Sequence, residues 1–430
     1  MGKERIFTMF QNKIGKKLAL SLLLALAAPS ALPQMTPAAV TVAEAHMMSC
    51  KQERGIGDKV LKKSIKGHNV QEAVGGVANI QNRLVTCNSD RLNMQDGKHK
   101  RYLSRTLVDS SVNWPNAFMA PGGKSVIYAK QIEIDRKDDR TASSQTDPER
   151  PLNLVNYSAE SNLASTLAHE YGHYANEDFL NAVDRHMALA IALACIPTPA
   201  TIAANAGIAA GNVMVVRQET FNMEKGADAT GVEFLANVPE YSMGSMITSF
   251  QNYQKYLRST NQKDGGGWRN FVTAHSHTDL RIDRVRDRIA EVSQSRVMLS
   301  KDGVLTVDGE RVNGTGRLMD MQLANGRERT NYLAGQIAST MKRHYWKPQY
   351  LRPMKESEFT GSGSEDRTVF VVCEKTDGKE GYGPIVKVLG TFDYPLGVSD
   401  CQLTALQKKA KAELQSIWNL TRTLRARMKA

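Results

Sequence analysis

Two histidines stand four residues apart in the segment His169-Glu170-Tyr171-Gly172-His173, and a glutamate directly follows the first of them. On an α-helix, residues four apart lie on one face about one turn apart, so both imidazoles can reach a single metal ion if the segment is helical. Apolar residues recur with helical spacing before it. The pattern predicts a helix from about residue 159 to residue 179 that presents a metal site.

A second predicted helix, over residues 218–236, carries two carboxylates one turn apart, Glu224 and Asp228. A catalytic zinc ion needs a third protein ligand and one open position, and Glu224 can supply that ligand. Asp228 can hold a ligand histidine through its second ring nitrogen. Glu170 can take a proton from a water molecule that the zinc activates. Gly231 would let the two helices approach closely.

Four motifs follow one another along the chain: Asn116-Ala117-Phe118 before Pro121-Gly122-Gly123, the histidine segment, residues 224–231, and residues 275–282. In this order they resemble the motifs of the M48 metallopeptidases, which include HtpX-like, Oma-type and CAAX prenyl endopeptidases and periplasmic relatives. The resemblance covers about residues 58–298. It implies a zinc metalloendopeptidase of the gluzincin type that acts on protein or peptide substrates.

The resemblance also implies roles for residues outside the ligand set. Substrate is expected to lie along the strand that follows Asn116, Ala117 and Phe118. His275 would project into the cleft, where it could stabilise the oxyanion or fill the open zinc position of a resting enzyme. Because a serine replaces the proline expected after it, His277 is kept as an alternative. A different class of function, a chaperone or assembly scaffold that keeps zinc without catalysis, is disfavoured by the presence of Glu170.

The remaining sequence predicts an α+β chain with a mainly helical zinc-peptidase domain, a small β-hairpin or sheet, and a smaller α+β domain at the C-terminus, of unknown role. The hairpin is predicted from strands at 107–108 and 125–129 with a Pro-Gly-Gly turn between them. Further helices and strands are expected at 58–85, 242–256, 278–295, 330–345, 368–375, 385–392 and 403–428. A polar loop at 135–156 would lie at the cleft mouth as a lid, and the apolar stretch 187–216 would form two short buried helices.

The first residues are basic and precede the apolar run Leu18 to Ala28 and the segment Ala43-Glu44-Ala45. This order is typical of a secretory signal peptide. It predicts a signal peptide at 1–45, a metallopeptidase domain at 46–298 and the C-terminal domain at 299–430. The protein would be exported, periplasmic or secreted; an uncleaved segment that anchors it to a membrane is the alternative.

The formal net charge is +12. A basic exterior suits association with an envelope or membrane surface, although a merely soluble surface explains it equally well. Because basic clusters with interleaved aromatic residues are absent from the sequence, nucleic acid is not an expected partner.

The sequence contains five cysteines. In an exported chain, cysteines usually pair. The predicted disulfides are Cys50–Cys87 and Cys373–Cys401, each of which would close a loop within one domain. Cys195, in an apolar stretch, would stay reduced.

Overall fold

The computed structural model describes residues 49–92, 102–136, 157–184, 222–261, 278–311, 326–342, 350–360, 365–375, 382–392 and 394–405, with shorter stretches at 95–96, 99–100 and between 407 and 419. Contacts divide the chain into Met1–Ala45 and His46–Ala430, and all described residues belong to the second unit. The predicted signal peptide, residues 137–156 of the polar lid, the apolar stretch 187–216 and Cys195 lie outside the described residues. The division predicted at residue 298 stays a prediction.

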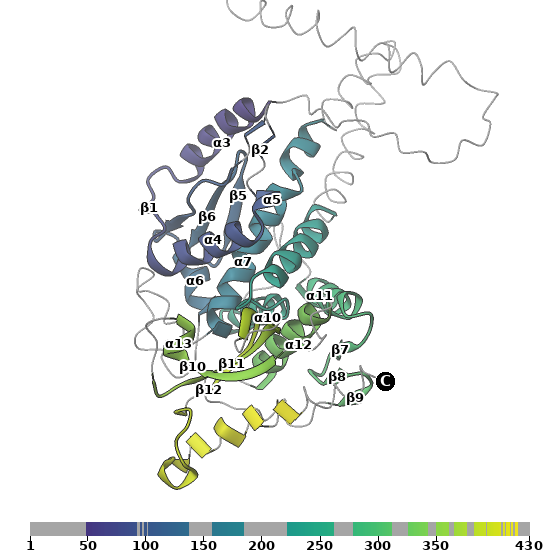
Figure 1. The fold of residues 1–430 in the computed structure, drawn as a ribbon. Helices are drawn as coiled ribbons and strands as arrows, with labels where there is room; N and C mark the ends of the chain where they lie inside the picture. Colours follow the sequence, from purple (N-terminus) through teal and green to yellow (C-terminus); the bar gives the residue numbers. More distant parts are fainter. Residues whose placement is uncertain are drawn as a thin grey trace, which may run out of the picture. The chain divides into compact units, whose positions relative to one another are not determined.

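A four-stranded sheet lies in the N-terminal half (Figure 1). Its order is β1 (Val70–Glu72), β4 (Leu107–Asp109), β6 (Lys124–Tyr128) and β5 (Ala117–Ala120). β5 turns into β6 through the predicted Pro-Gly-Gly segment, where both glycines have positive φ. The predicted strands exist, but the hairpin joins β5 to β6, whereas β4 runs parallel to β6. Within the described sheet β5 is therefore an edge strand.

Helices pack against this sheet and against one another. The N-terminal helical region, predicted as one or two helices, forms two, α3 (Cys50–Ser64) and α4 (Gly75–Cys87). α4 buries residues at helical spacing, including Val77, Ile80 and Leu84. α7 (Tyr157–Ala175) carries the histidine segment and buries Leu163 and Leu167 completely. The other elements of this region are α5 (Ser89–Leu92), β2 (Gln95–Asp96), β3 (His99–Lys100) and α6 (Ala129–Asp135).

A buried chain of hydroxyl groups fixes α7 against the sheet. Thr106 Oγ1 lies 2.8 Å from the Tyr171 hydroxyl and 2.8 Å from Ser125 Oγ. Tyr171, Thr106 and Ser125 are all at most 1% exposed. Burial raises the pKa of Tyr171 above its usual value, so the phenol stays protonated and keeps a hydrogen to donate. The middle residue of the histidine segment thus locks the rotation of the helix that presents the two histidines.

The second half begins with a helix over residues 222–237, followed by α10 (Ser245–Ser259) and α11 (Thr278–Val292). α10 packs against α7, α11 and α12 (Gly326–Lys342). Two three-stranded antiparallel sheets follow the order β7-β8-β9 and β10-β11-β12. Their strands are β7 (Val297–Leu299), β8 (Leu305–Val307), β9 (Glu310–Arg311), β10 (Tyr350–Lys355), β11 (Thr368–Lys375) and β12 (Tyr382–Phe392), with α13 (Glu356–Thr360) and η2 (Asp400–Gln402) between and after them.

The C-terminal elements share the core of the helical region. Leu333 and Ile337 of α12, and Phe370 of β11, belong to the same buried cluster as Leu163 and Leu167 of α7. Lys387 of β12 is fully buried and donates to the carbonyl oxygens of Val238, at 2.7 Å, and Tyr241, at 3.2 Å. The chain that leaves helix 222–237 is therefore held by the C-terminal sheet.

The predicted disulfides Cys50–Cys87 and Cys373–Cys401 are not seen among the described residues. Cys50 begins α3 and Cys87 ends α4. Cys373 is 2% exposed in β11 and packs in a small apolar cluster, while Cys401 is exposed and lies 3.1 Å from Ser399 Oγ. The two thiols therefore lie in different environments, Cys373 buried in a sheet and Cys401 exposed to solvent. The structure thus gives no support to the pair Cys373–Cys401.

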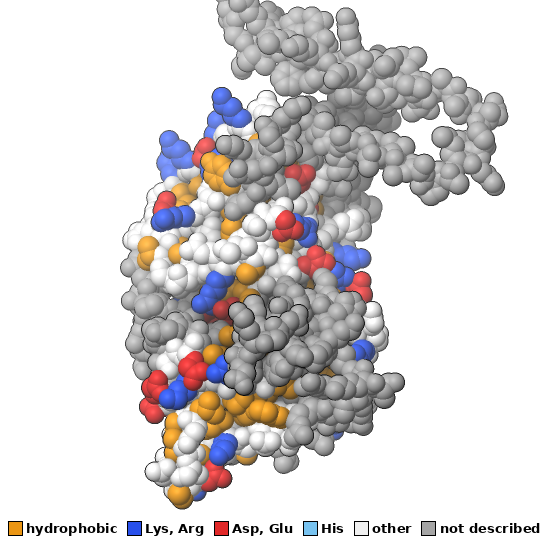
Figure 2. All heavy atoms as spheres, in the orientation of Figure 1, with side chains coloured by type: hydrophobic (Ala, Val, Ile, Leu, Met, Phe, Trp, Pro, Cys, Tyr) orange, Lys and Arg blue, Asp and Glu red, His pale blue; other side chains and the backbone are white. Residues whose placement is uncertain are grey.

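Charges are mixed on the surface of the described part. Figure 2 shows Lys and Arg side chains interspersed with Asp and Glu on the face in view. None of the helices in the described ranges has the length and apolar character that a membrane crossing requires.

Candidate metal centre

The site is built where α7 crosses helix 222–237, and two glycines allow the crossing. A Cβ atom at Gly172 would lie 2.6 Å from the carbonyl oxygen of Ala227, and one at Gly231 would lie 3.0 Å from the backbone nitrogen of His169. Real side chains are not tolerated at such distances. The predicted role of Gly231 in close helix approach is confirmed, and Gly172 contributes equally from the other helix.

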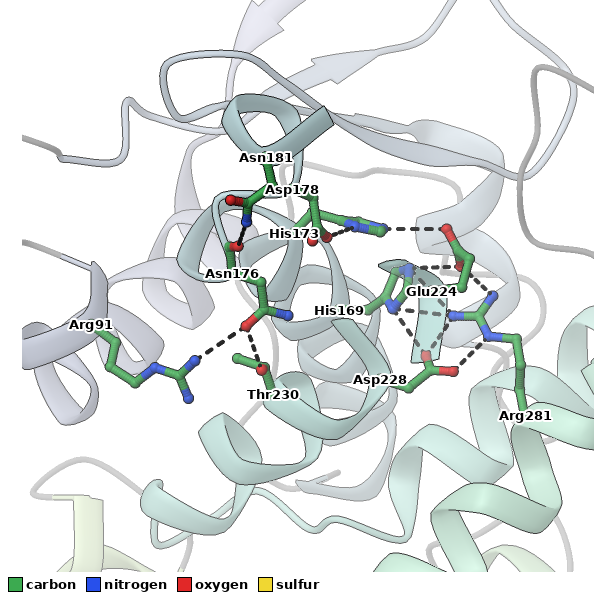
Figure 3. A network of polar contacts seen from close by, with 10 residues as sticks. All are labelled: Arg91, His169, His173, Asn176, Asp178, Asn181, Glu224, Asp228, Thr230 and Arg281. Atoms are coloured by element: carbon green, nitrogen blue, oxygen red, sulfur yellow. Dashed lines mark hydrogen bonds and ion pairs between the residues drawn. The ribbon is translucent and has the colours of Figure 1, made fainter. Parts of the chain in front are cut away.

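Three predicted ligands meet at this crossing. His169 Nε2 lies 3.4 Å from one oxygen of Glu224, and His173 Nε2 lies 3.3 Å from the other. One ligand atom from each of the three residues lies within 4.8 Å of the others. Figure 3 shows both imidazoles turned toward the Glu224 carboxylate. Glu224, which follows His173 by 51 positions and His169 by 55, thus joins both histidines in a single cluster.

The other ring nitrogen of each histidine faces a carboxylate. Asp228 Oδ1 lies 3.0 Å from His169 Nδ1, as the sequence predicts, and Asp178 Oδ2 lies 2.7 Å from His173 Nδ1. Such contacts fix ring orientation and leave Nε2 available as a ligand atom. Sequence reasoning missed Asp178. The sequence feature that could have indicated it is its position five residues after His173, because the chain turns after the end of α7 and places Asp178 beside the His173 ring.

Burial by itself would lower the pKa of His173, but Asp178 and Glu224 outweigh it and raise the pKa to about 10. The two carboxylates thus make the cluster attractive to positive charge. A metal ligand must be a neutral imidazole, so metal binding at this cluster releases protons.

Arg281 of α11 is the main site residue without a predicted role. It is 3% exposed, and its guanidinium donates to Asp228 at 2.9 and 2.6 Å and lies 3.3 Å from Glu224. The guanidinium also stacks over Phe250, 4.3 Å from the ring centre. These carboxylates hold the pKa of Arg281 above its usual value, although burial opposes the shift. The sequence feature that could have indicated its role is its position within the fourth motif, residues 275–282.

The cluster fits zinc in spacing and in donor chemistry. Two atoms bound about 2.1 Å from one ion at a tetrahedral angle are about 3.4 Å apart. His169 lies 3.4 Å from one Glu224 oxygen and His173 lies 3.3 Å from the other, so each imidazole is near that separation from the carboxylate, and one ligand atom from each of the three residues lies within 4.8 Å of the others. Two imidazole nitrogens and one carboxylate oxygen form the donor set of a hydrolytic zinc site, which keeps one position open.

A cavity of about 60 Å³ adjoins the cluster on the side of Glu170. His169 and Glu170 both line it, and Glu170 is only 2% exposed. Asn116 and Ala117, at the start of β5, form part of its wall. The predicted substrate residue Phe118 is not part of this wall and makes an edge-to-face contact with Tyr128, with ring centres 6.3 Å apart.

The structure therefore brings together His169, Glu170, His173, Glu224 and Asp228, with Asn116 and Ala117 nearby. His275 and His277 lie outside the described residues, as does most of the polar lid segment. Their predicted roles stay predictions.

Comparison with known proteins agrees with this geometry. A scan against protein-family models matches residues 98–289 to Peptidase family M48. That match contains the described sheet strands β4 to β6, both ligand helices and Arg281. A search of curated proteins finds no match to this chain. Residues 98–289 therefore form a domain of Peptidase family M48, a metallopeptidase family, and within it His169, His173 and Glu224 form a cluster like a zinc site.

Proposed function

We propose that this protein cleaves peptide bonds inside protein substrates, with Glu170 as the general base. The observation that carries the proposal is the position of Glu170, which is next to a ligand of a cluster with tetrahedral zinc spacing and lines the adjacent cavity. A carboxylate in that place is not needed to hold a structural metal, and a structural zinc site is usually closed by four protein ligands. The alternative function as a non-catalytic scaffold is therefore disfavoured.

When bound, zinc would polarise the substrate carbonyl and lower the pKa of a water molecule. Glu170 would accept a proton from that water and return it to the leaving amine. His169, His173 and Glu224 would hold the ion, while Asp228 and Asp178 would keep the two imidazoles in place.

Substrate would bind as an extended chain beside β5. This strand pairs with β6 on one side only within the described sheet, and its first residues reach the cavity. Extended peptides commonly add to a free sheet edge through main-chain hydrogen bonds, with side chains entering pockets alternately. Asn116, Ala117 and Phe118 would then act through position and backbone more than through side-chain chemistry.

We further propose that the protein is exported and works in the cell envelope. The support is the basic start of the chain, the apolar run after it and the Ala43-Glu44-Ala45 segment. Cell fractionation followed by N-terminal sequencing of the mature protein tests this. A protein that stays in the cytoplasm with Met1 intact would contradict it.

The deciding experiment for the reaction combines metal analysis with digestion of casein by the zinc-loaded protein. Wild type and Glu170→Gln are compared, with Glu233→Gln as a matched control. Glu233 lies on the ligand helix but is 31% exposed and pairs with Arg91 and Arg288. Equal cleavage by wild type and Glu170→Gln would reject the proposed role of Glu170.

A further inference from the structure

The cavity beside Glu170 is lined by residues of α7 and α10, among others. α7 contributes Thr166 one turn before His169, and α10 contributes Met246, Ser249 and Phe250. A peptide whose scissile carbonyl lies at the metal has its neighbouring side chains within a few ångströms. One of these side chains must therefore meet the cavity.

The size of the cavity limits what can enter it. One water-sized group needs about 10–15 Å³ of such space, so about 60 Å³ holds four to six non-hydrogen atoms. Leucine and methionine side chains have four such atoms, phenylalanine has seven and tryptophan ten. Alanine would leave most of the space unfilled.

The chemistry of the floor favours an apolar occupant. Asp135, at the end of α6, is fully buried behind the cavity and accepts hydrogen bonds from three of its lining residues. Thr166 Oγ1 donates to it at 2.7 Å, Ser249 Oγ at 2.6 Å and Gln131 Nε2 at 3.0 Å. Because these donors point to Asp135, the cavity presents mainly their carbon atoms.

The charge of the lining disfavours a cationic occupant. Arg281 lines the cavity, with its guanidinium over the ring of Phe250. A substrate lysine or arginine would meet this fixed positive charge. Asp135 lies behind its three donors, and the lining carboxylate Glu170 stands next to the ligand His169, where it is the proposed base.

We propose that this cavity is a specificity pocket that takes one leucine or methionine side chain from a residue flanking the scissile bond. Asp135 is a positioning residue that holds Thr166, Ser249 and Gln131 and so sets the depth of the pocket. The inference rests on the proposed peptidase function and adds the class of peptide that is cleaved fastest.

The test compares kcat/KM of the zinc-loaded protein on a peptide series that carries leucine, methionine, alanine, phenylalanine or lysine at each position around the cleaved bond. Wild type is expected to prefer leucine and methionine at one flanking position by about 10–100-fold. Ser249→Leu fills the pocket and should shift the preference to alanine. Ser249→Ala removes the same hydrogen bond without filling the space and should keep the preference for leucine.

Circular dichroism and zinc stoichiometry establish that each variant is folded. If Ser249→Leu does not fold, Tyr253→Ala serves instead, because Tyr253 also lines the cavity and its truncation should admit phenylalanine. A folded, zinc-bound Ser249→Leu that still prefers leucine, or a Tyr253→Ala that gains nothing on phenylalanine, overturns the inference.

A binding measurement separates failure of the pocket from failure of the reaction. Labelled peptides are titrated into zinc-loaded Glu170→Gln, with and without Ser249→Leu, and followed by fluorescence anisotropy. If leucine peptides bind more tightly than the others and Ser249→Leu abolishes this difference, the pocket is supported. Absence of cleavage by wild type in the same experiments would then reject only the proposed function. If wild type cleaves the peptides but neither the cleavage rates nor the binding affinities depend on the flanking side chain, only the pocket is rejected.

Discussion

The guanidinium of Arg281 donates two hydrogen bonds to the carboxylate of Asp228, at 2.9 and 2.6 Å. The two residues lie on different helices and are 53 positions apart in the sequence. Asp228 in turn lies 3.0 Å from His169, and Arg281 reaches Glu224. Desolvation opposes ionisation of Asp228, but Arg281 and His169 outweigh it and hold the pKa of Asp228 below its usual value. One cation therefore orients both carboxylates of the ligand helix.

Arg281→Lys is expected to fold but to bind zinc about 10–100-fold more weakly, because a point charge cannot replace the paired contacts with Asp228. Competition with a chromogenic chelator measures the affinity. Arg281→Ala leaves buried carboxylates without their cation and should lower the free energy of unfolding by about 3–5 kcal/mol. Unchanged zinc affinity in the lysine variant would show that Arg281 serves the fold alone.

Glu224→Ala is expected to lose zinc, since two histidines alone do not complete a catalytic site. Glu233→Ala, on the same helix and outside the cluster, should keep one ion for each chain. Metal analysis after dialysis gives the ratio directly. One tightly bound zinc in Glu224→Ala would mean that another residue is the third ligand.

Glu170→Gln is expected to keep zinc and to lose cleavage by about 10²–10⁴-fold, because the amide cannot accept the proton but is not part of the ligand set. Metal content and casein digestion are measured on the same preparation. Loss of the metal together with activity would instead place Glu170 among the ligands.

Asp135 should make stability depend on pH. Burial raises its pKa from 3.8 to about 6, against the opposing hydrogen bonds from Gln131, Ser249 and Thr166, which do not titrate in this range. Between about pH 4 and pH 6 the folded protein therefore binds more proton than the unfolded chain, and stability falls as pH rises through this window.

Asp135→Asn removes that titration. The unfolding free energy of wild type relative to Asp135→Asn should decrease by about 2 kcal/mol from pH 4 to pH 7, which is most of the roughly 3 kcal/mol that corresponds to the shift in pKa. Urea unfolding at several pH values measures both proteins. A difference that stays constant over this range would show that Asp135 titrates normally in the folded state.

The sequence predicted the ligand cluster because helical spacing fixes which side chains share a face, as with His169 and His173. For the same reason it predicted that Asp228 would hold a ligand histidine, since one turn separates Asp228 from Glu224, and the structure identifies that histidine as His169. Arg281 received no role because a long side chain that spans two helices leaves no periodic signal near its partners. Asp135 was missed because its three donors come from three different elements.

The strand patterns were predicted less well. The Pro-Gly-Gly turn was recognised, but the apolar residues Ala117 to Ala120 before it were assigned to the connection, although they form β5. The packing of α12 and β12 against the ligand region depends on contacts such as Lys387 with Val238, which no local pattern encodes. The predicted cysteine pairs are likewise not seen among the described residues, and the burial of Cys373 depends on the whole sheet rather than on a local pattern.

The two glycines at the helix crossing have a consequence for how this site tolerates sequence change. The separation of the ligand-bearing helices is set by contact of backbone atoms, at Gly172 against Ala227 and at Gly231 against His169. Backbone atoms are the same in every residue, so drift among the apolar side chains around the crossing leaves the distance from His169 to Glu224 unchanged. Mutational robustness of the metal site therefore depends on two positions that carry no side chain, whereas the pocket walls remain free to diverge.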